Sequence, residues 1–186
     1  MVLDIGGGSP ATGAGFFARV IVPHVKQIHV MDLNIGESID TSPKIVFHRS
    51  LASYETVSKL LKENPRVTHV ACISVFEHIP HEIRCGIIKA VNEYFPGDTF
   101  VATLDFHPKE CYFEHQLVSR TVSEMFALFT SFYPDTISKS PFWCENAFYG
   151  SSFGDRILRR FGFRKGKEPL TPLWYPVAFR FRRLVK

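Results

Sequence analysis

The 186-residue chain lacks several features that would define its function class at once. Its four cysteines form no C-x-x-C pair, which argues against a zinc site and favours reduced, scattered thiols. There is no run of about 18 apolar residues and no charged segment before a short apolar one. The sequence therefore predicts no membrane span and no signal peptide, and we expect a cytoplasmic protein without a metal site.

Internal repeats, low-complexity tracts and linker-like segments are also missing, so we expect a single domain over residues 1–186. Acidic residues are scarce near the C-terminus: residues 156–186 hold ten basic side chains and one acid, Glu168. A basic segment can bind phosphate or nucleic acid. Residues 179–182, however, alternate apolar and basic side chains, and this pattern favours an outward-facing strand.

What the chain does contain is an alternation of strand and helix patterns. Short β-rich segments at 2–5, 28–31, 44–47, 67–73 and 99–104 predict strands, and stretches at 15–22, 53–64 and 80–95 predict helices. Repeated β-α units of this length indicate an α/β fold, a Rossmann-like three-layer sandwich with a mostly parallel sheet. Ligands of such sheets bind at the carboxyl ends of the strands.

The most informative motif opens the chain and reads Val2-Leu3-Asp4-Ile5-Gly6-Gly7-Gly8-Ser9. Glycines after a strand let backbone N–H groups approach a ligand closely. Asp32 follows the second predicted strand, where a carboxylate accepts both hydroxyl hydrogens of a ribose. Either feature alone also fits an ordinary turn, but the two together favour a ribose-bearing cofactor.

Two kinds of cofactor fit this motif. Gly6-x-Gly8-x-x-Ala11 formally satisfies the dinucleotide fingerprint, so an NAD-dependent oxidoreductase stays an open alternative. Asp4, however, lies at the strand end where the pyrophosphate of a dinucleotide would sit, and its carboxylate would repel that group. A cofactor that carries an ammonium and a sulfonium group is instead attracted by acidic charge.

In their order and spacing, these segments resemble the class I S-adenosylmethionine-dependent methyltransferases. Residues 2–8 are similar to the glycine-rich first motif of that family, 30–33 to its acidic second motif, and 74–80 to the segment after strand four in its small-molecule branch. Residues 160–163 resemble the Gly-Phe before the final hairpin, with 177–184 as the last strand. The resemblance implies a seven-stranded sheet with a C-terminal antiparallel hairpin.

The resemblance also implies roles for individual residues. The implied cofactor-binding positions are Asp4, Gly6, Gly7, Gly8, Asp32, Leu33, Ser50, Ser74, Val75 and Phe76. The glycines leave room for the methionine part of S-adenosylmethionine, and Asp4 orients its amino group. Asp32 holds the ribose, Leu33 packs on the adenine, Ser50 is a candidate beside the adenine amine, and residues 74–76 border the transferring methyl group.

Methyl transfer is an in-line displacement, so much of its catalysis comes from proximity and alignment. A general base is needed where a hydroxyl acceptor must lose its proton early. His78 and His107 are the candidate bases, because an imidazole titrates near neutral pH. Glu77 beside His78 is too small a set to predict a metal site.

Residues 112–150 are expected to be an insertion on the substrate side. Apolar residues recur every three or four positions from Val118 to Phe132, which predicts an amphipathic helix that packs on the sheet. The aromatic-rich segment 140–149 fits either a wall of the acceptor pocket or further packing. Relatives usually carry helices before the first strand that are missing here, so we expect this insertion, a second copy of the chain or a partner to cover the cofactor.

The predicted function is methyl transfer from S-adenosylmethionine to a small-molecule acceptor, with oxygen preferred and S-adenosylhomocysteine as product. Three alternatives stay open: an RNA-directed methyltransferase that uses the basic C-terminal region, an NAD-dependent oxidoreductase, and a non-catalytic cofactor-binding subunit.

Overall fold

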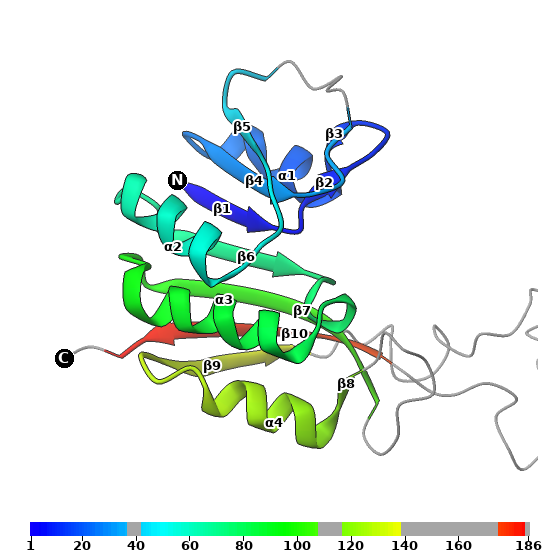
Figure 1. The fold of residues 1–186 in the computed structure, drawn as a ribbon, viewed down its shortest axis with the longest axis vertical. Coiled ribbons are helices and arrows are strands. Elements are labelled where there is room, and N and C mark those ends of the chain that lie inside the picture. Colours follow the sequence, from blue (N-terminus) through cyan, green and yellow to red (C-terminus); the bar gives the residue numbers. More distant parts are fainter. Residues whose placement is uncertain (37–41, 108–116, 139–174, 185–186) are drawn as a thin grey trace, which may run out of the picture.

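A computed structural model describes residues 1–36, 42–107, 117–138 and 175–184. Its central feature is one sheet with the strand order β5-β4-β1-β6-β7-β10-β9 (Figure 1). The seven strands are β1 (Val2–Ile5), β4 (Ile28–Asp32), β5 (Ile45–Arg49), β6 (His69–Ile73), β7 (Thr99–His107), β9 (Phe132–Ser138) and β10 (Tyr175–Arg183). A two-residue strand, β8 (Leu117–Val118), pairs with the end of β7.

Parallel pairing joins β5, β4, β1, β6 and β7, and β10 runs antiparallel to both of its neighbours. The chain reverses its direction across the sheet after β5, so β1 and β6 flank the switch point at which open α/β sheets bind ligands. This topology confirms the predicted Rossmann-like sandwich and its C-terminal antiparallel strands.

Helices lie on both faces of the sheet. Figure 1 shows α2 (Tyr54–Glu63), α3 (His81–Tyr94) and α4 (Ser119–Ala127) in chain order along one face. Their apolar stripes form the main core with alternate residues of the strands, such as Leu3 and Ile5. The six-residue α1 (Phe16–Ile21) and the 3-10 turn η1 (Val22–His24) pack on the other face, against Val2 and Val30. None of the described helices is long and apolar enough to cross a membrane.

The sequence signals explain where α2 begins and ends. Ser53 caps the helix, because its Oγ accepts from the Thr56 N–H at 3.3 Å and its own N–H donates to Thr56 Oγ1 at 2.9 Å. Asn64 closes it with its N–H donated to the Leu60 carbonyl. The predicted helix over 53–64 is therefore confirmed within a residue at each end.

The predicted helix from Val118 to Phe132 is wrong in its second half. The helix α4 ends at Ala127, and Phe132 begins β9. Asn92 of α3 stabilises the intervening turn, because its amide donates to the Leu128 carbonyl at 2.6 Å and accepts from the Ser131 N–H at 3.2 Å. The turn places Phe129 and Phe132 in the core. Their spacing therefore matches that of a helix although neither residue belongs to one.

The range 112–150 is therefore only partly testable as an insertion. Residues 117–138 supply α4 and β9, and β9 is the edge strand of the main sheet. The rest of that range and the Gly-Phe at 162–163 lie outside the described residues. On β10, Phe179 and Phe181 are buried, whereas Arg180 and Arg182 face outward. The predicted alternation is thus confirmed.

Candidate functional site

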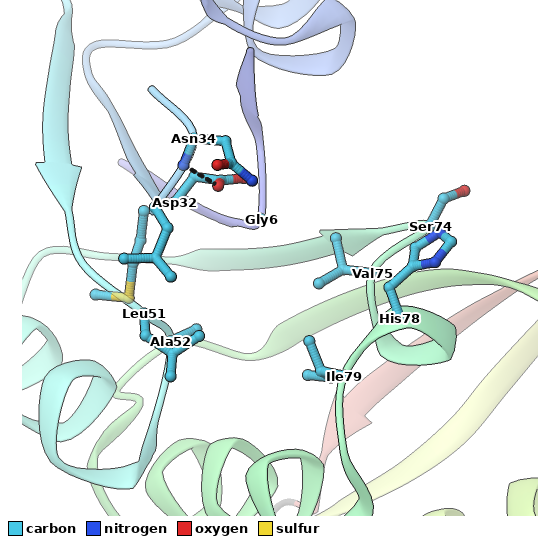
Figure 2. Close-up of a pocket in the computed structure, with 11 residues that line it drawn as sticks. Gly6, Asp32, Asn34, Leu51, Ala52, Ser74, Val75, His78 and Ile79 are labelled. Carbon is cyan, nitrogen blue, oxygen red and sulfur yellow. Dashed lines mark hydrogen bonds between the residues drawn. The ribbon is translucent and has the colours of Figure 1, made fainter. Parts of the chain in front are cut away.

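A cavity of about 380 Å³ lies where β1, β4, β5 and β6 end (Figure 2). Its volume lies within the range of small-molecule and cofactor sites. Loops after these four strands line it, with the residues Gly6, Met31, Asp32, Leu33, Asn34, Leu51, Ala52, Ser74, Val75, His78 and Ile79. The structure thus brings together six of the predicted site residues, which are Gly6, Asp32, Leu33, Ser74, Val75 and His78.

The glycine turn after β1 is too crowded for any other residue. Gly6 has a φ of +74°, its N–H donates to the Met31 carbonyl at 2.7 Å, and a Cβ there would lie 2.4 Å from a Val75 methyl carbon. A Cβ on Gly7 would lie 1.9 Å from Asp4 Oδ2. Gly7 and Gly8 do not line the cavity themselves; they let the turn pass between Asp4 and Asp32.

After Gly8 the chain does not enter a helix directly. The two-residue strands β2 (Gly8–Ser9) and β3 (Gly13–Ala14) form a small hairpin, and α1 starts only at Phe16. Ala11 therefore lies in the hairpin turn and not at a helix start, which is where the dinucleotide fingerprint would require it. This geometry argues against the NAD alternative.

Asp32 joins two loops at the edge of the cavity. Its Oδ2 accepts from the Gly8 N–H at 3.0 Å, and its Oδ1 accepts from the Asn34 N–H at 2.7 Å. An ionised carboxylate has about four acceptor positions, so both oxygens can still accept from a ligand hydroxyl. Asp32 is thus held in place with acceptor capacity left over.

Asp4 is the most unusual polar residue of the site. Its side chain is 1 % exposed, and within the described residues neither carboxylate oxygen has a hydrogen-bond partner. Burial, and then the nearby charge of Asp32, raise the pKa of Asp4 to about 7. The carboxylate does not line the cavity but lies directly behind Gly7. A cation above the glycine turn would stabilise its ionised form.

Large apolar side chains border the cavity at the ends of β4 and β5. Leu33 is 60 % exposed and Leu51 is 47 % exposed, so both present apolar surface to the cavity that they line. Ser50 does not line the cavity; its N–H donates to the His48 carbonyl at 2.9 Å. Sequence reasoning chose Ser50 and missed its neighbours Leu51 and Ala52, although an apolar residue at a strand end was a usable signal.

The loop after β6 forms the other side of the cavity in Figure 2, where Val75 and Ile79 lie across from Asp32 and Leu51 and the ring of His78 lies beside Ser74. Ser74 begins this loop with a φ of +53°. Phe76 differs from its neighbours Ser74 and Val75, because its side chain is fully buried and stacks on Phe100 with ring centroids 6.1 Å apart. Phe76 therefore belongs to the core and does not line the cavity.

The structure describes the side chain of only one of the two candidate bases. His78 is an exposed residue of the short 3-10 turn η2 (Phe76–His78) and lines the cavity. His107 is the last residue of β7, and its side chain lies outside the described part of the chain. Among the described residues, no cluster of three or more His, Cys, Asp or Glu side chains is arranged to hold a metal ion.

Known structures resemble the whole chain, although a scan against protein-family models and a search of curated proteins found no match. A putative S-adenosylmethionine-dependent methyltransferase from Listeria monocytogenes aligns with a TM-score of 0.59 at 12 % identity, over 99 % of this chain and 90 % of that one. The cyclopropane synthase MmaA2 from Mycobacterium tuberculosis aligns with a TM-score of 0.59 at 13 % identity, over 98 % and 77 %.

Magnesium protoporphyrin IX methyltransferase from Synechocystis PCC 6803, solved with bound SAM, has a TM-score of 0.54 at 12 % identity, over 99 % of this chain and 70 % of that one. At such low identity the likeness concerns the arrangement of the elements. Together with the strand order and the cavity at the switch point, it establishes that the chain has the fold of the class I S-adenosylmethionine-dependent methyltransferases.

Proposed function

We propose that the protein is an S-adenosylmethionine-dependent methyltransferase that acts on a small-molecule acceptor through oxygen. The observation that carries this proposal is the pair of carboxylates at the ends of β1 and β4, with Asp4 buried behind the glycine turn and Asp32 at the cavity wall. A cationic amino acid part and a ribose are the groups that such a pair would bind.

The residues around the cavity fit S-adenosylmethionine in three respects. Asp32 offers acceptor positions to the ribose hydroxyls, and the exposed Leu33 and Leu51 offer apolar surface to the adenine. The glycine turn leaves space for the methionine part, and its ammonium would stabilise the ionised form of Asp4. The volume of about 380 Å³ is in the range of cofactor sites.

S-adenosylmethionine supplies a methyl group that is bound to a positively charged sulfur and is open to in-line attack. The protein contributes alignment, because the loop after β6 brings Val75, His78 and Ile79 to the side of the cavity opposite Asp32. His78 accepts the proton that a hydroxyl acceptor loses, from its exposed position on η2. This proton acceptance is the reason to prefer oxygen as the acceptor atom.

Two observations bear on the acceptor. The solved structures with this fold include a methyltransferase of magnesium protoporphyrin IX, a small molecule, and also the small RNA methyltransferase HEN1, so the fold does not decide between the two acceptors. The RNA alternative relies on the basic C-terminal region, but Arg180 donates to Asp135 at 2.7 Å and Arg182 donates to Asp98 at 2.6 Å. These ion pairs offset the charge of Arg180 and Arg182, two of the three described basic residues of that region, and so weaken its support for an RNA acceptor.

Calorimetric titration with S-adenosylmethionine, S-adenosylhomocysteine and NAD tests the proposal. We expect the two sulfur ligands to bind and NAD not to bind. Binding of NAD alone would overturn the proposal in favour of an oxidoreductase. Binding of the sulfur ligands without methyl transfer to any of a panel of hydroxylated small molecules would favour the non-catalytic subunit.

A further inference from the structure

The loop over residues 74–79 connects β6 to α3 and forms one side of the cavity. Hydrogen bonds from outside the loop hold both its beginning and its end. Thr103 of β7 contacts the beginning, and Arg84 of α3 contacts the end. Neither residue lines the cavity, and neither follows from a sequence motif.

Thr103 fixes an uncommon backbone conformation at the start of the loop. The Ser74 N–H donates to the Thr103 carbonyl and to Thr103 Oγ1, each at 3.0 Å, and the Ser74 and Thr103 hydroxyl oxygens lie 3.3 Å apart. The φ of Ser74 is +53°, in the left-handed region that residues with a side chain rarely adopt. Such a conformation persists only where contacts with the rest of the structure hold it, and here the hydrogen bonds with Thr103 provide those contacts.

Arg84 holds the end of the loop from the first turns of α3. Its Nη1 donates to the Phe76 carbonyl at 2.7 Å and to the Ile79 carbonyl at 2.9 Å. Arg84 is 8 % exposed, and burial lowers the pKa of its guanidinium, while the charges of Cys85, Glu82 and the buried Glu77 raise it. A buried guanidinium is costly to desolvate, and the two backbone acceptors offset part of that cost, while Nε has no partner among the described residues.

We propose that Arg84 and Thr103 are positioning residues for the cofactor and acceptor site. By fixing both ends of the loop, they hold Val75, His78 and Ile79 in the orientation that lines the cavity. The inference depends on the proposed function only for the identity of the ligand. The effect of Arg84 and Thr103 on the loop can be measured without any ligand.

Amide hydrogen exchange tests the first half of this inference. Arg84→Met and Thr103→Val should speed exchange in peptides that span residues 74–80, whereas Arg84→Lys and Thr103→Ser, which keep a donor or a hydroxyl, should speed it less. Lys89→Met on α3 and Thr99→Val on β7 are controls at sites away from the loop. Wild-type exchange in both Arg84→Met and Thr103→Val would overturn the inference.

Titration with S-adenosylhomocysteine, well below the melting temperature of each variant, tests the second half. We expect the Kd to rise about tenfold in Arg84→Met, because without these two hydrogen bonds the loop would hold its binding conformation only about a tenth of the time, and to recover in part in Arg84→Lys. A role limited to stability would lower the melting temperature and leave the Kd unchanged, which would overturn the inference. If the wild type binds no S-adenosylhomocysteine, the proposed function fails, and hydrogen exchange alone decides whether the loop is held.

Discussion

At the scale of single residues, the proposed role of Asp4 predicts that ligand binding depends on pH. The pKa of its carboxyl is raised to about 7, so in the free protein it is mostly protonated at pH 6 and mostly ionised at pH 8. A ligand ammonium favours the ionised form. We therefore expect the affinity for S-adenosylhomocysteine to rise about tenfold from pH 6 to pH 8. Calorimetry over this range should show the rise in the wild type and a flat profile in Asp4→Asn; parallel profiles would contradict the role of Asp4.

The same residue affects stability with a definite sign. A carboxyl whose pKa is raised in the folded state binds more protons when folded, so its contribution to the free energy of unfolding falls as pH rises from about 4 to 7. Denaturant titrations should show this fall in the wild type relative to Asp4→Asn. An equal pH dependence in the two proteins would show that the carboxyl is not buried as described.

Asp32 gives a second prediction at this scale. Replacing it with alanine removes the acceptor for the ribose and also the partner of the Gly8 N–H. We expect at least about a tenfold rise in the Kd for S-adenosylhomocysteine, since a hydrogen bond to a charged group contributes about 1.5–3 kcal/mol. Asp135→Ala, which removes the ion pairs of Asp135 with Arg180 and Arg182 at the distant edge of the sheet, is the control. An unchanged affinity in Asp32→Ala would refute the ribose assignment.

At the scale of elements, the edge strand β5 and its neighbour β4 carry a pair of histidines that predicts sensitivity to acid. His29 Nδ1 lies 2.9 Å from His48 Nε2, and their rings stack at 5.2 Å. Burial, then the charge of His48 and that of the N-terminus, lower the pKa of His29 to about 4. Burial also lowers the pKa of His48, against the charge of Glu63.

As the pH falls, His29 becomes protonated in the unfolded chain before it does in the folded protein. Its contribution to the free energy of unfolding is therefore fully present above pH 6.5 and is lost as the pH falls towards 4. The loss is at most about 3 kcal/mol. Acid titration of His29→Phe should show less of this loss than the wild type. His69→Gln, at an exposed position on β6, is the control and should follow the wild type. Asp4 acts in the opposite direction over part of this range, so each histidine variant is compared directly with the wild type.

Elements also show where sequence patterns suffice. The boundaries of α2 follow from Ser53 and Asn64, because helix caps are local in sequence. The end of α4 does not, since Asn92, which stabilises the turn after it, lies 36 residues earlier than its partner Leu128. Asp32 and the glycine turn were predictable from motifs. The burial of Phe76 and the contacts of Arg84 with the loop did not follow from motifs, because the direction of a side chain in an irregular loop depends on tertiary contacts.

At the scale of the whole molecule, ligand binding should stabilise the fold. A ligand that binds only the folded state at a hundred times its Kd adds about 2.7 kcal/mol, which raises Tm by roughly 5–10 °C for a chain of this size. Scanning calorimetry should show this shift with S-adenosylhomocysteine and none with NAD. A shift with NAD alone would contradict the proposed cofactor.

The fold could be predicted from the sequence more readily than the location of the protein or its partners. Alternating β and α patterns of regular length leave few arrangements other than a parallel sheet with helices on both faces, and the strand order confirms one of them. The cytoplasmic location, and the second copy or partner expected over the cofactor, stay predictions because no pattern in the described residues encodes them.

The hydrogen bond from the Gly8 N–H to the Asp32 carboxylate has a consequence for protein engineering. The carboxylate assigned to recognise the ribose also fastens the loop after β1 to the end of β4. A redesign that exchanges Asp32 to accept an altered cofactor would therefore release the glycine turn at the same time. Such a redesign must also supply a new acceptor for the Gly8 N–H. Without one, a change in affinity caused by the released loop would be mistaken for a change in cofactor preference.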